Sequence, residues 1–265
     1  MKVDSIALGA PVWADLSTSD FDRAATFYNA IFGWDVPPGT ADFGGYSTAT
    51  LNGANVAGVS PKWGDPGAAD APDAWTVYLH TADAATTAQA MTANGGHLMM
   101  QPMEVGPFGT MAVGTDPAGA FFGVWQPNMH KGFGVFAEAG APCWFETRSQ
   151  DAAKSTAFYP ATFGLELRTT TMEDGSTYNL LLANDTMVAG ITDASSLATP
   201  GAPSHWLVYF GVEDTDAAIA HIESLGGSTI MGAQDSEFGR WAIVADPMGA
   251  VFAIVSVSDS GGTDR

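Results

Sequence analysis

The stretch Gly9-Ala10-Pro11-Val12-Trp13 appears a second time in this chain, as Gly140-Ala141-Pro142-Cys143-Trp144. Other landmarks return in the same order. They are Phe27-Tyr28 with Phe158-Tyr159, Phe32-Gly33 with Phe163-Gly164, Trp75-Thr76-Val77-Tyr78 with Trp206-Leu207-Val208-Tyr209, Gly95-Gly96 with Gly226-Gly227, and Asp116-Pro117-Ala118-Gly119-Ala120 with Asp246-Pro247-Met248-Gly249-Ala250. The offset is 130 or 131 residues throughout. A constant offset over so many landmarks indicates two fused copies of one domain-sized unit.

The length and composition agree with two globular domains. The 265 residues divide into halves of a common domain size, which we place at 1–130 and 131–265. No apolar run approaches the roughly 20 residues that span a bilayer. The first residues lack the apolar stretch of a signal peptide, so we expect a cytoplasmic protein. The single cysteine, Cys143, lies in an apolar run, where we expect a buried thiol.

The charge balance is strongly acidic, with 29 Asp and Glu against 9 Lys and Arg. Phosphate contacts need a basic surface, so the balance argues against nucleic acid as a partner, and equally against an anionic membrane. It is compatible with a cationic small molecule. It is also what a solvated surface that keeps a protein soluble would show.

Each half contains two copies of a shorter pattern of a strand, a helix and further strands. In the first copy Asp20 can cap a helix whose apolar residues run at helical spacing from Phe21 to Phe32, and Gly33 can end it. The predicted strands are 11–16, 46–51 and 54–59, with a hairpin turn at Asn52-Gly53, and 61–72 is predicted to be a linker.

The second copy predicts strands at 75–81, 98–101, 110–115 and 120–126 around a helix from Asp83 to Ala93. The four units therefore cover about 9–60, 74–126, 140–193 and 204–257. They predict an α+β fold of four βαβββ units that form two tandem domains. Pro160 falls inside the third helix, where we expect it to kink the helix or move its boundary.

These features resemble the vicinal-oxygen-chelate superfamily, and most closely its two-domain glyoxalase/bleomycin resistance protein/dioxygenase-like members. The resemblance rests on four units in the right order and on a Ser/Asp-capped helix that carries Phe-Tyr and closes on Phe-Gly. It also rests on the late Asp116-Pro117-Ala118-Gly119 and Asp246-Pro247-Met248-Gly249 turns. It covers nearly the whole chain. It implies strands that curl around a cavity, but the family has several chemistries, so function is argued from the site.

The resemblance also implies where a catalytic metal would be bound. The six corresponding positions are Trp13, Ala74 and Gly123 in the first half and Trp144, His205 and Ala253 in the second. Only His205 carries a metal-ligating side chain, and one imidazole is too few for a catalytic divalent ion. We therefore expect no metal and no other cofactor. The remaining route to a metal is a relocated site that uses Asp15, Glu146 or His80.

The residues that replace the ligands predict an aromatic cavity instead. Strand alternation places a carboxylate two residues after each tryptophan, on the same face of its sheet. The predicted ligand-binding residues are Trp13, Asp15, Tyr78, His80, Trp125, Trp144, Glu146, His205 and Tyr209. The small residues Ala74, Gly123 and Ala253 are expected to leave room beside them. Indoles beside acids suit a flat or cationic organic ligand through stacking and cation–π contact.

Three functions remain open on the sequence. The first is a metal-independent protein that binds a small aromatic or cationic molecule and sequesters it, for example an antibiotic or a secondary metabolite. The second is a lyase, dioxygenase or hydroxylase-like enzyme that acts on a small aromatic or carbonyl substrate, with His205 as general acid or base or with a relocated metal. The third is a structural or signalling protein with a vestigial pocket, in which the tryptophans only fill a core and His205 is a hydrogen-bonded strand-end residue.

Two further expectations follow from the sequence. The remaining histidines, His97, His130 and His221, are predicted to lie at the surface or in turns. Since the fused halves can pair within one chain, we expect a monomer or a weak homodimer.

The ligand positions generate a direct test. Plasma emission analysis of the purified protein after mild dialysis should find no stoichiometric divalent metal. About one equivalent of zinc, iron, manganese or nickel per chain would contradict this expectation, and substitution of Asp15, Glu146, His80 and His205 would then identify the ligands.

Overall fold

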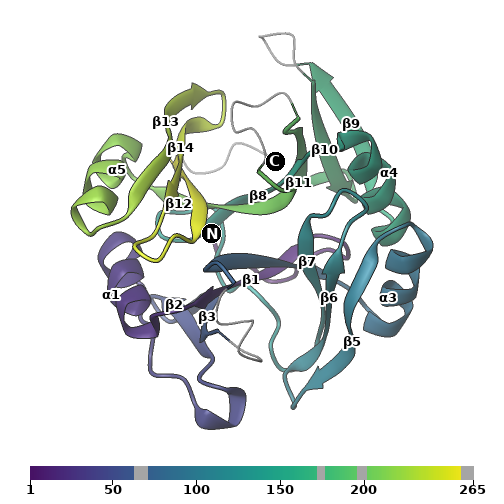
Figure 1. The fold of residues 1–265 in the computed structure, drawn as a ribbon, viewed down its shortest axis with the longest axis horizontal. Helices are drawn as coiled ribbons and strands as arrows, with labels where there is room; N and C mark the ends of the chain where they lie inside the picture. The colour runs from purple at the N-terminus through teal and green to yellow at the C-terminus, as the bar shows by residue number, and fades with distance from the viewer. Residues whose placement is uncertain (63–70, 172–176, 196–201, 258–265) are drawn as a thin grey trace.

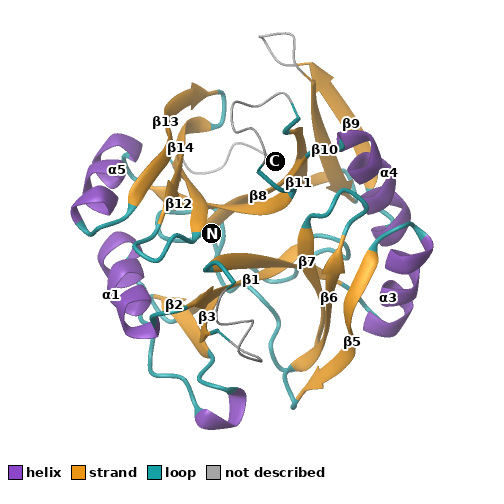
Figure 2. Cartoon of the chain, viewed as in Figure 1, coloured by secondary structure: helices purple, strands orange, loops and turns teal. Residues whose placement is uncertain are grey.

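A computed structural model describes residues 1–62, 71–171, 177–195 and 202–257 (Figure 1). Most of the predicted linker 61–72 lies outside these residues. Strands of both halves run through the centre of the molecule, and the α-helices lie at its periphery on two opposite sides (Figure 2). Within the described residues, no helix is long and apolar enough to cross a membrane.

The first half forms one curved sheet. Its elements are β1 (Pro11–Thr18), α1 (Phe21–Phe32), the short 3-10 helix η1 (Ala41–Phe43), β2 (Ser47–Leu51), β3 (Ala54–Pro61), β4 (Ala74–His80), α3 (Ala84–Ala93), β5 (His97–Val105), β6 (Gly109–Thr115) and β7 (Phe121–Pro127). The strand order is β2-β3-β1-β4-β7-β6-β5. The two units meet where β1 and β4 pair antiparallel.

The second half repeats this sheet and adds one strand. Its elements are β8 (Pro142–Ser149), α4 (Ala152–Phe163), β9 (Glu166–Thr171), β10 (Thr177–Ala183), β11 (Thr186–Asp193), β12 (His205–Val212), α5 (Thr215–Ser224), β13 (Ser228–Ser236), β14 (Gly239–Ala245) and β15 (Val251–Ser256). The order is β9-β10-β11-β8-β12-β15-β14-β13. The predicted α+β fold of two tandem domains is confirmed.

The first unit departs from the predicted βαβββ pattern because it has only two strands after its helix. The position of β9 corresponds to the residues from Asp35 onward, which make only an isolated bridge between Asp35 and Thr50. Pro37 and Pro38 follow directly. Proline has no N–H to donate to a ladder, which explains why the strand is lost in this unit alone.

The predicted local signals act as expected at helix starts and in turns. Each of the four helices begins after an aspartate whose side chain accepts a hydrogen bond from a backbone N–H three residues later. Asn52 and Gly53 both have positive φ, 51° and 82°, as a two-residue hairpin requires. Helix α4 spans Pro160 and ends at the residue equivalent to the end of α1, so the expected shift of its boundary is wrong.

The two halves are interlocked through their first helices. Tyr28 of α1 donates its hydroxyl hydrogen to Asp246 in the second half, at 3.1 Å. Ser155 of α4 donates to Asp116 in the first half, at 2.7 Å. Both aspartates begin the repeated turn before the last strand of their half. Figure 1 shows the result, with α1 beside α5 on one side and α3 beside α4 on the other.

Aromatic packing follows the same exchange. Tyr28 contacts Phe252 of β15 at 5.7 Å between ring centroids, and Tyr159 contacts Phe122 of β7 at the same distance. Each tyrosine hydroxyl also accepts from the indole of its own half, Trp75 at 3.2 Å or Trp206 at 2.9 Å. All these side chains are buried. The helix-covered face of each sheet is therefore completed by the other half.

This interlock predicts the effect of removing one hydroxyl. Tyr28→Phe leaves both Asp246 and the Trp75 indole without this buried partner, so the free energy of unfolding should fall by about 1–3 kcal/mol in urea denaturation. Thr26→Ala, on the exposed side of α1, is the control and should change it by about 0.5 kcal/mol or less. Equal effects of the two variants would show that the buried contact contributes nothing.

Candidate functional site

The predicted tryptophan and carboxylate of β1 lie on the sheet face away from the helices. Trp75, which contacts Tyr28 of α1, is paired with Leu16, so alternation turns Trp13 and Asp15 to the opposite face. The Trp13 indole N–H donates to the Tyr46 hydroxyl at 2.7 Å.

Tyr78, directly opposite Trp13, forms a hydrogen bond with Asp15. Trp13, Asp15, Tyr46 and Tyr78 together form the first-half cluster.

The second half repeats this arrangement almost group for group. The Trp144 indole donates to the Tyr178 hydroxyl at 2.9 Å, and that hydroxyl donates to Glu146 Oε2, also at 2.9 Å. The Tyr209 hydroxyl lies 3.5 Å from Glu146 Oε1. Trp144, Glu146, Tyr178 and Tyr209, with Arg148 described below, form the second-half cluster.

Glycines make room for the tyrosines of both clusters. A Cβ atom at Gly58 would lie 2.0 Å from the Tyr46 hydroxyl oxygen, and one at Gly190 would lie 1.8 Å from that of Tyr178. At Gly123, which we expected to leave room for a ligand, a Cβ would lie 2.2 Å from the Tyr78 ring. The space above Gly123 is filled by this tyrosine.

Glu146 is buried and Asp15 is half-buried, and the pKa values of both carboxyl groups are raised. Desolvation raises the pKa of Asp15 to about 7, and the hydrogen bond from Tyr78 acts in the opposite direction. Desolvation also raises the pKa of Glu146, opposed by the positive charge of Arg148 and by hydrogen bonds from Tyr178, Thr192 and Tyr209. The two halves thus differ in how their buried acid is compensated.

Arg148 is a site residue that we did not predict. Its guanidinium lies 3.8 Å from Glu146 Oε1, and the two side chains are only 9% and 8% exposed. It follows Glu146 by two residues, so strand alternation alone could have placed it on this face. The equivalent residue of β1 is Ser17, which carries no charge, so this position does not supply a cation beside Asp15.

The two predicted histidines lie at the margins of their clusters. His80 Nδ1 lies 2.8 Å from the Ile6 carbonyl oxygen, which ties the side chain to the N-terminal segment. His205 is paired with Arg148 across β8 and β12, and its Nδ1 lies 2.9 Å from the Pro203 carbonyl oxygen. Desolvation lowers the pKa of His205, so its imidazole is neutral at pH 7. It is the hydrogen-bonded strand-end residue that was one of our alternatives.

The segment that connects the halves covers the first-half cluster. His130 meets the Trp13 indole edge to face, with ring centroids 4.3 Å apart, and Phe133 packs against it at 5.3 Å. The Trp125 indole donates to the His130 carbonyl oxygen at 3.0 Å. Burial lowers the pKa of His130 to about 4. The expectation that His130 lies at the surface or in a turn is therefore corrected: its imidazole packs into this cluster.

Trp144 has no such cover among the described residues. Trp13 is 3% exposed, whereas Trp144 is half-buried, and no ring contact with Trp144 occurs in the part of the chain that the structure describes. Beneath it Leu207, Tyr209, Ile243 and Ala253 form a small apolar cluster separate from the main core, with Trp144 and Trp241 packed at its edge. Trp144 is therefore the more accessible of the two tryptophans.

Two of the cluster residues that were not predicted, Tyr46 and Tyr178, occupy similar places in the two halves of the repeat. Tyr46 directly precedes β2, the strand that pairs with β3. Tyr178 lies near the start of β10, the strand that pairs with β11. Each tyrosine therefore comes before the hairpin turn of its half. A search of the repeat for matching tyrosines would have found them. His130 and Phe133 have no such signal, because only the path of the connecting segment brings them to Trp13.

The side chains at the expected ligand positions do not fit a catalytic metal. Both indole N–H groups donate to tyrosines, the Tyr78 ring covers Gly123, and His205 faces a backbone carbonyl. Within the described ranges, no group of three His, Cys, Asp or Glu side chains converges as a metal site would require. Asp15, Glu146 and His80 therefore do not form a relocated site there.

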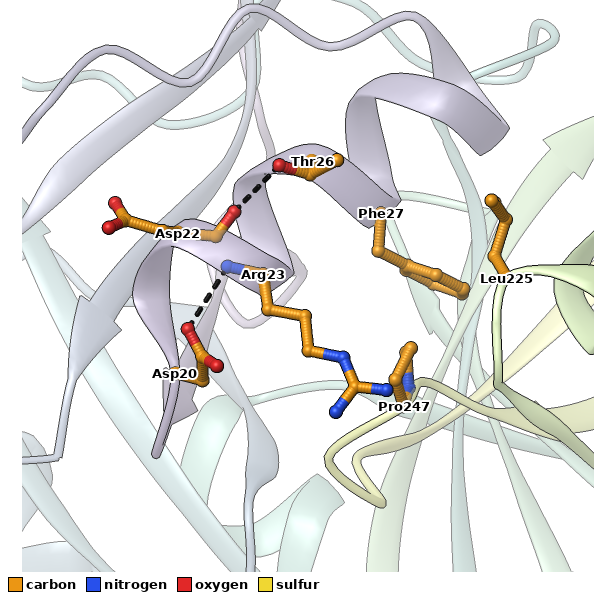
Figure 3. Close-up of a pocket in the computed structure, with 7 residues that line it drawn as sticks. All are labelled: Asp20, Asp22, Arg23, Thr26, Phe27, Leu225 and Pro247. Atoms are coloured by element: carbon orange, nitrogen blue, oxygen red, sulfur yellow. Dashed lines mark hydrogen bonds between the residues drawn. The ribbon is translucent and has the colours of Figure 1, made fainter.

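A surface hollow lies away from both clusters, at the contact between the halves. It has a volume of about 380 Å³ and lies beside α1, where Arg23 extends toward Pro247 and Leu225 of the second half (Figure 3). Asp20 and Asp22 line its other side. It is open and lies on the helix-covered side, so it belongs to the interlock rather than to the clusters.

The raised pKa of Asp15 predicts a specific pH dependence of stability. The pKa of Asp15 is higher in the folded state than in the unfolded chain. Between about pH 4 and pH 7 the unfolded chain has therefore lost this proton while the folded state still holds it, so the free energy of unfolding falls as the pH rises. Asp15→Asn should remove this loss. At pH 8 the variant should be more stable by at most about 4 kcal/mol, and the gain should shrink as the pH falls toward 5.

Urea denaturation of both proteins between pH 5 and pH 8.5 measures this difference, and the other titrating groups cancel in the comparison. A difference in unfolding free energy that does not change over this range would show that Asp15 titrates normally.

Two known proteins are similar to nearly the whole chain. CFP32 of Mycobacterium tuberculosis, described as a candidate glyoxylase, is 37% identical over 251 residues, which cover 93% of this chain and 94% of that protein. The anthracycline biosynthesis protein DnrV of Streptomyces peucetius is 36% identical over 267 residues, covering 96% and 95%.

Solved structures share the fold at much lower identity. The Mn(II)-bound glyoxalase from Novosphingobium aromaticivorans matches with a TM-score of 0.65 and 15% identity, over 95% of this chain and 83% of that one. The 2,3-dioxygenase LapB from Pseudomonas sp. KL28 matches with a TM-score of 0.63 and 13% identity, over 98% and 94%. A family model matches residues 10–124 and 144–254. The chain belongs to the glyoxalase/bleomycin resistance protein/dioxygenase superfamily.

Proposed function

We propose that this protein binds a flat aromatic small molecule without a metal, at the second-half cluster. The observation that carries this proposal is the difference between two equivalent tryptophans. Trp13 is covered by His130 and Phe133, whereas the face of Trp144 has no such cover among the described residues. A half-buried indole held in place by Tyr178 is a stacking surface whose orientation is set before a ligand arrives.

The surroundings of Trp144 suit an aromatic ligand. The apolar floor of Leu207, Tyr209, Ile243 and Ala253 offers area to bury, and Trp241, 6.0 Å from the Tyr209 ring, supplies a second half-buried indole. Polar groups are few and are held at defined positions, as in small-molecule sites generally.

Two relatives support an aromatic ligand class. DnrV and DauV, both Streptomyces proteins, are named for anthracycline biosynthesis, and anthracyclines are fused-ring aromatic compounds. We accordingly take a flat, fused-ring aromatic as the ligand class and sequestration or delivery of such a compound as the role.

One observation favours an enzyme as the second candidate. Glu146 is a buried carboxyl with a raised pKa, hydrogen-bonded to the Tyr178 hydroxyl, and a carboxyl of this kind can act as a general acid or base. His205, our sequence-based candidate for acid–base catalysis, is tied to Pro203 at the margin. A fused-ring ligand recovered chemically changed by the wild-type protein but unchanged by Glu146→Gln would establish catalysis.

Substitution of the tryptophans tests the binding proposal. Trp144→Ala should weaken the binding of a three-ring aromatic such as anthraquinone-2-carboxamide more than tenfold, because stacking contributes on the order of 1 kcal/mol beyond the buried area of the indole. Trp13→Phe, in the covered cluster, is the matched control and should leave the affinity unchanged. Isothermal titration calorimetry measures both.

Two results would contradict the proposal. Absence of saturable binding would favour a vestigial pocket. Weakening by Trp13→Phe but not by Trp144→Ala would place the site in the first half instead.

A further inference from the structure

We infer that the ligand carries an acidic oxygen, as a carboxylate, phenolate or enolate, which Arg148 binds while Glu146 takes up a proton. This inference rests on the proposed function, since it names the ligand chemistry of the same second-half cluster. The carboxylates alone favour a cationic ligand. The inference instead favours an anionic ligand, because it takes the positive charge of Arg148 into account.

The contacts of Arg148 leave hydrogen-bond donors for a ligand. A guanidinium has five N–H donors. Its ion pair with Glu146 is long, at 3.8 Å, whereas a close pair of this kind lies at about 2.7–2.9 Å. Its other described partner is the Tyr209 hydroxyl.

The surface residue Arg240 shows what full pairing looks like in this chain. Its three nitrogens donate to Asp216 and Asp235 at 2.9, 2.9 and 3.1 Å. Arg148, although far more buried, is much less completely paired, and a buried cation in this condition favours an anionic partner.

Glu146 does not neutralise Arg148 directly because its oxygens are engaged elsewhere. Oε2 accepts from Tyr178 at 2.9 Å, Oε1 lies 3.5 Å from the Tyr209 hydroxyl, and Thr192 supplies a further hydrogen bond. The carboxylate is positioned by hydroxyl groups, and it lies near the guanidinium without forming a close ion pair with it. An incoming carboxylate can therefore take the free side of Arg148 without breaking this network.

An anion beside Glu146 also makes ionisation of that carboxyl less favourable. The ionisable groups around it are Arg148, Tyr178, Tyr209 and His205. Burial and the neighbouring charges keep both tyrosines protonated, and His205 is neutral at pH 7. Glu146 is thus the group that responds when the ligand adds a negative charge, since its pKa is already raised by desolvation. Binding should be accompanied by uptake of as much as one proton.

The first half supplies the matched comparison. Trp13, Asp15 and Tyr46 repeat the groups around Trp144, but Ser17 stands where the second half has Arg148. The repeat thus contains the same aromatic and acidic arrangement without the cation, and beneath a cover. An anion preference should belong to the second half alone.

Three probes of equal shape test the inference: anthraquinone-2-carboxylate, anthraquinone-2-carboxamide and 2-(aminomethyl)anthraquinone. Titration calorimetry at pH 7 should find the carboxylate bound at least tenfold more tightly than the amide, and the ammonium probe most weakly. Arg148→Met should weaken the carboxylate at least tenfold and leave the amide within about twofold. Asp15→Asn, in the first half, should change none of the three affinities.

Glu146→Gln provides a second readout that does not depend on removing Arg148. Calorimetry of the carboxylate in buffers of different ionisation enthalpy should show proton uptake by the wild-type protein. Its affinity should rise as the pH falls from 8 to 6. Both effects should disappear in Glu146→Gln, which should bind the carboxylate more tightly than the wild type at pH 8.

The outcomes separate the inference from the proposed function. Trp144-dependent binding of all three probes with equal affinity, or tightest binding of the ammonium probe, overturns the inference and leaves the proposed function standing. Binding of the carboxylate without proton uptake, or unaffected by Arg148→Met, also overturns it. Failure of every probe to bind overturns both.

Discussion

The structure depends on an exchange of helices between the two halves. Helix α1 packs its Tyr28 onto Phe252 and the Asp246 turn of the second half, and α4 packs its Tyr159 and Ser155 onto Phe122 and the Asp116 turn of the first. Neither half can bury the aromatic side chains of its first helix alone. The fusion of two copies in one chain keeps this partner at high effective concentration, which is why the interface can be so extensively aromatic and buried.

This exchange decides where a ligand can bind. The helix-covered faces are buried where the halves join. Only the opposite faces of the two sheets are left for a ligand, and the tryptophan–tyrosine–carboxylate clusters lie on those faces. The two faces then diverge for a reason outside the repeat. The segment after β7 must travel to β8, and on its way His130 and Phe133 close over Trp13.

Each cluster contains a carboxyl group whose desolvation lowers the stability of the folded state when the group is charged. Asp15 has no cation beside it and its pKa rises to about 7, which permits it to remain protonated and uncharged. Glu146 has Arg148 nearby, yet the two do not form a close pair. A buried charge that is incompletely paired contributes little to stability, and the proposed ligand would supply the partner that Arg148 lacks.

The sequence by itself determined the fold to a large extent, because the signals involved are local or repeated. Helix-capping aspartates, the Asn52-Gly53 turn and the spacing of the two copies each act over a few residues or recur at a constant offset. Alternation along β1 and β8 likewise placed Trp13, Asp15, Trp144 and Glu146 correctly on one face. The tertiary structure alone decided what lies across from them. The cover of His130 and Phe133 comes from the segment that connects the halves, and the charge of the site depends on the distance between Arg148 and Glu146. Contacts of that kind arise from the path of the chain in space, for which the spacing of residues along the sequence carries no signal.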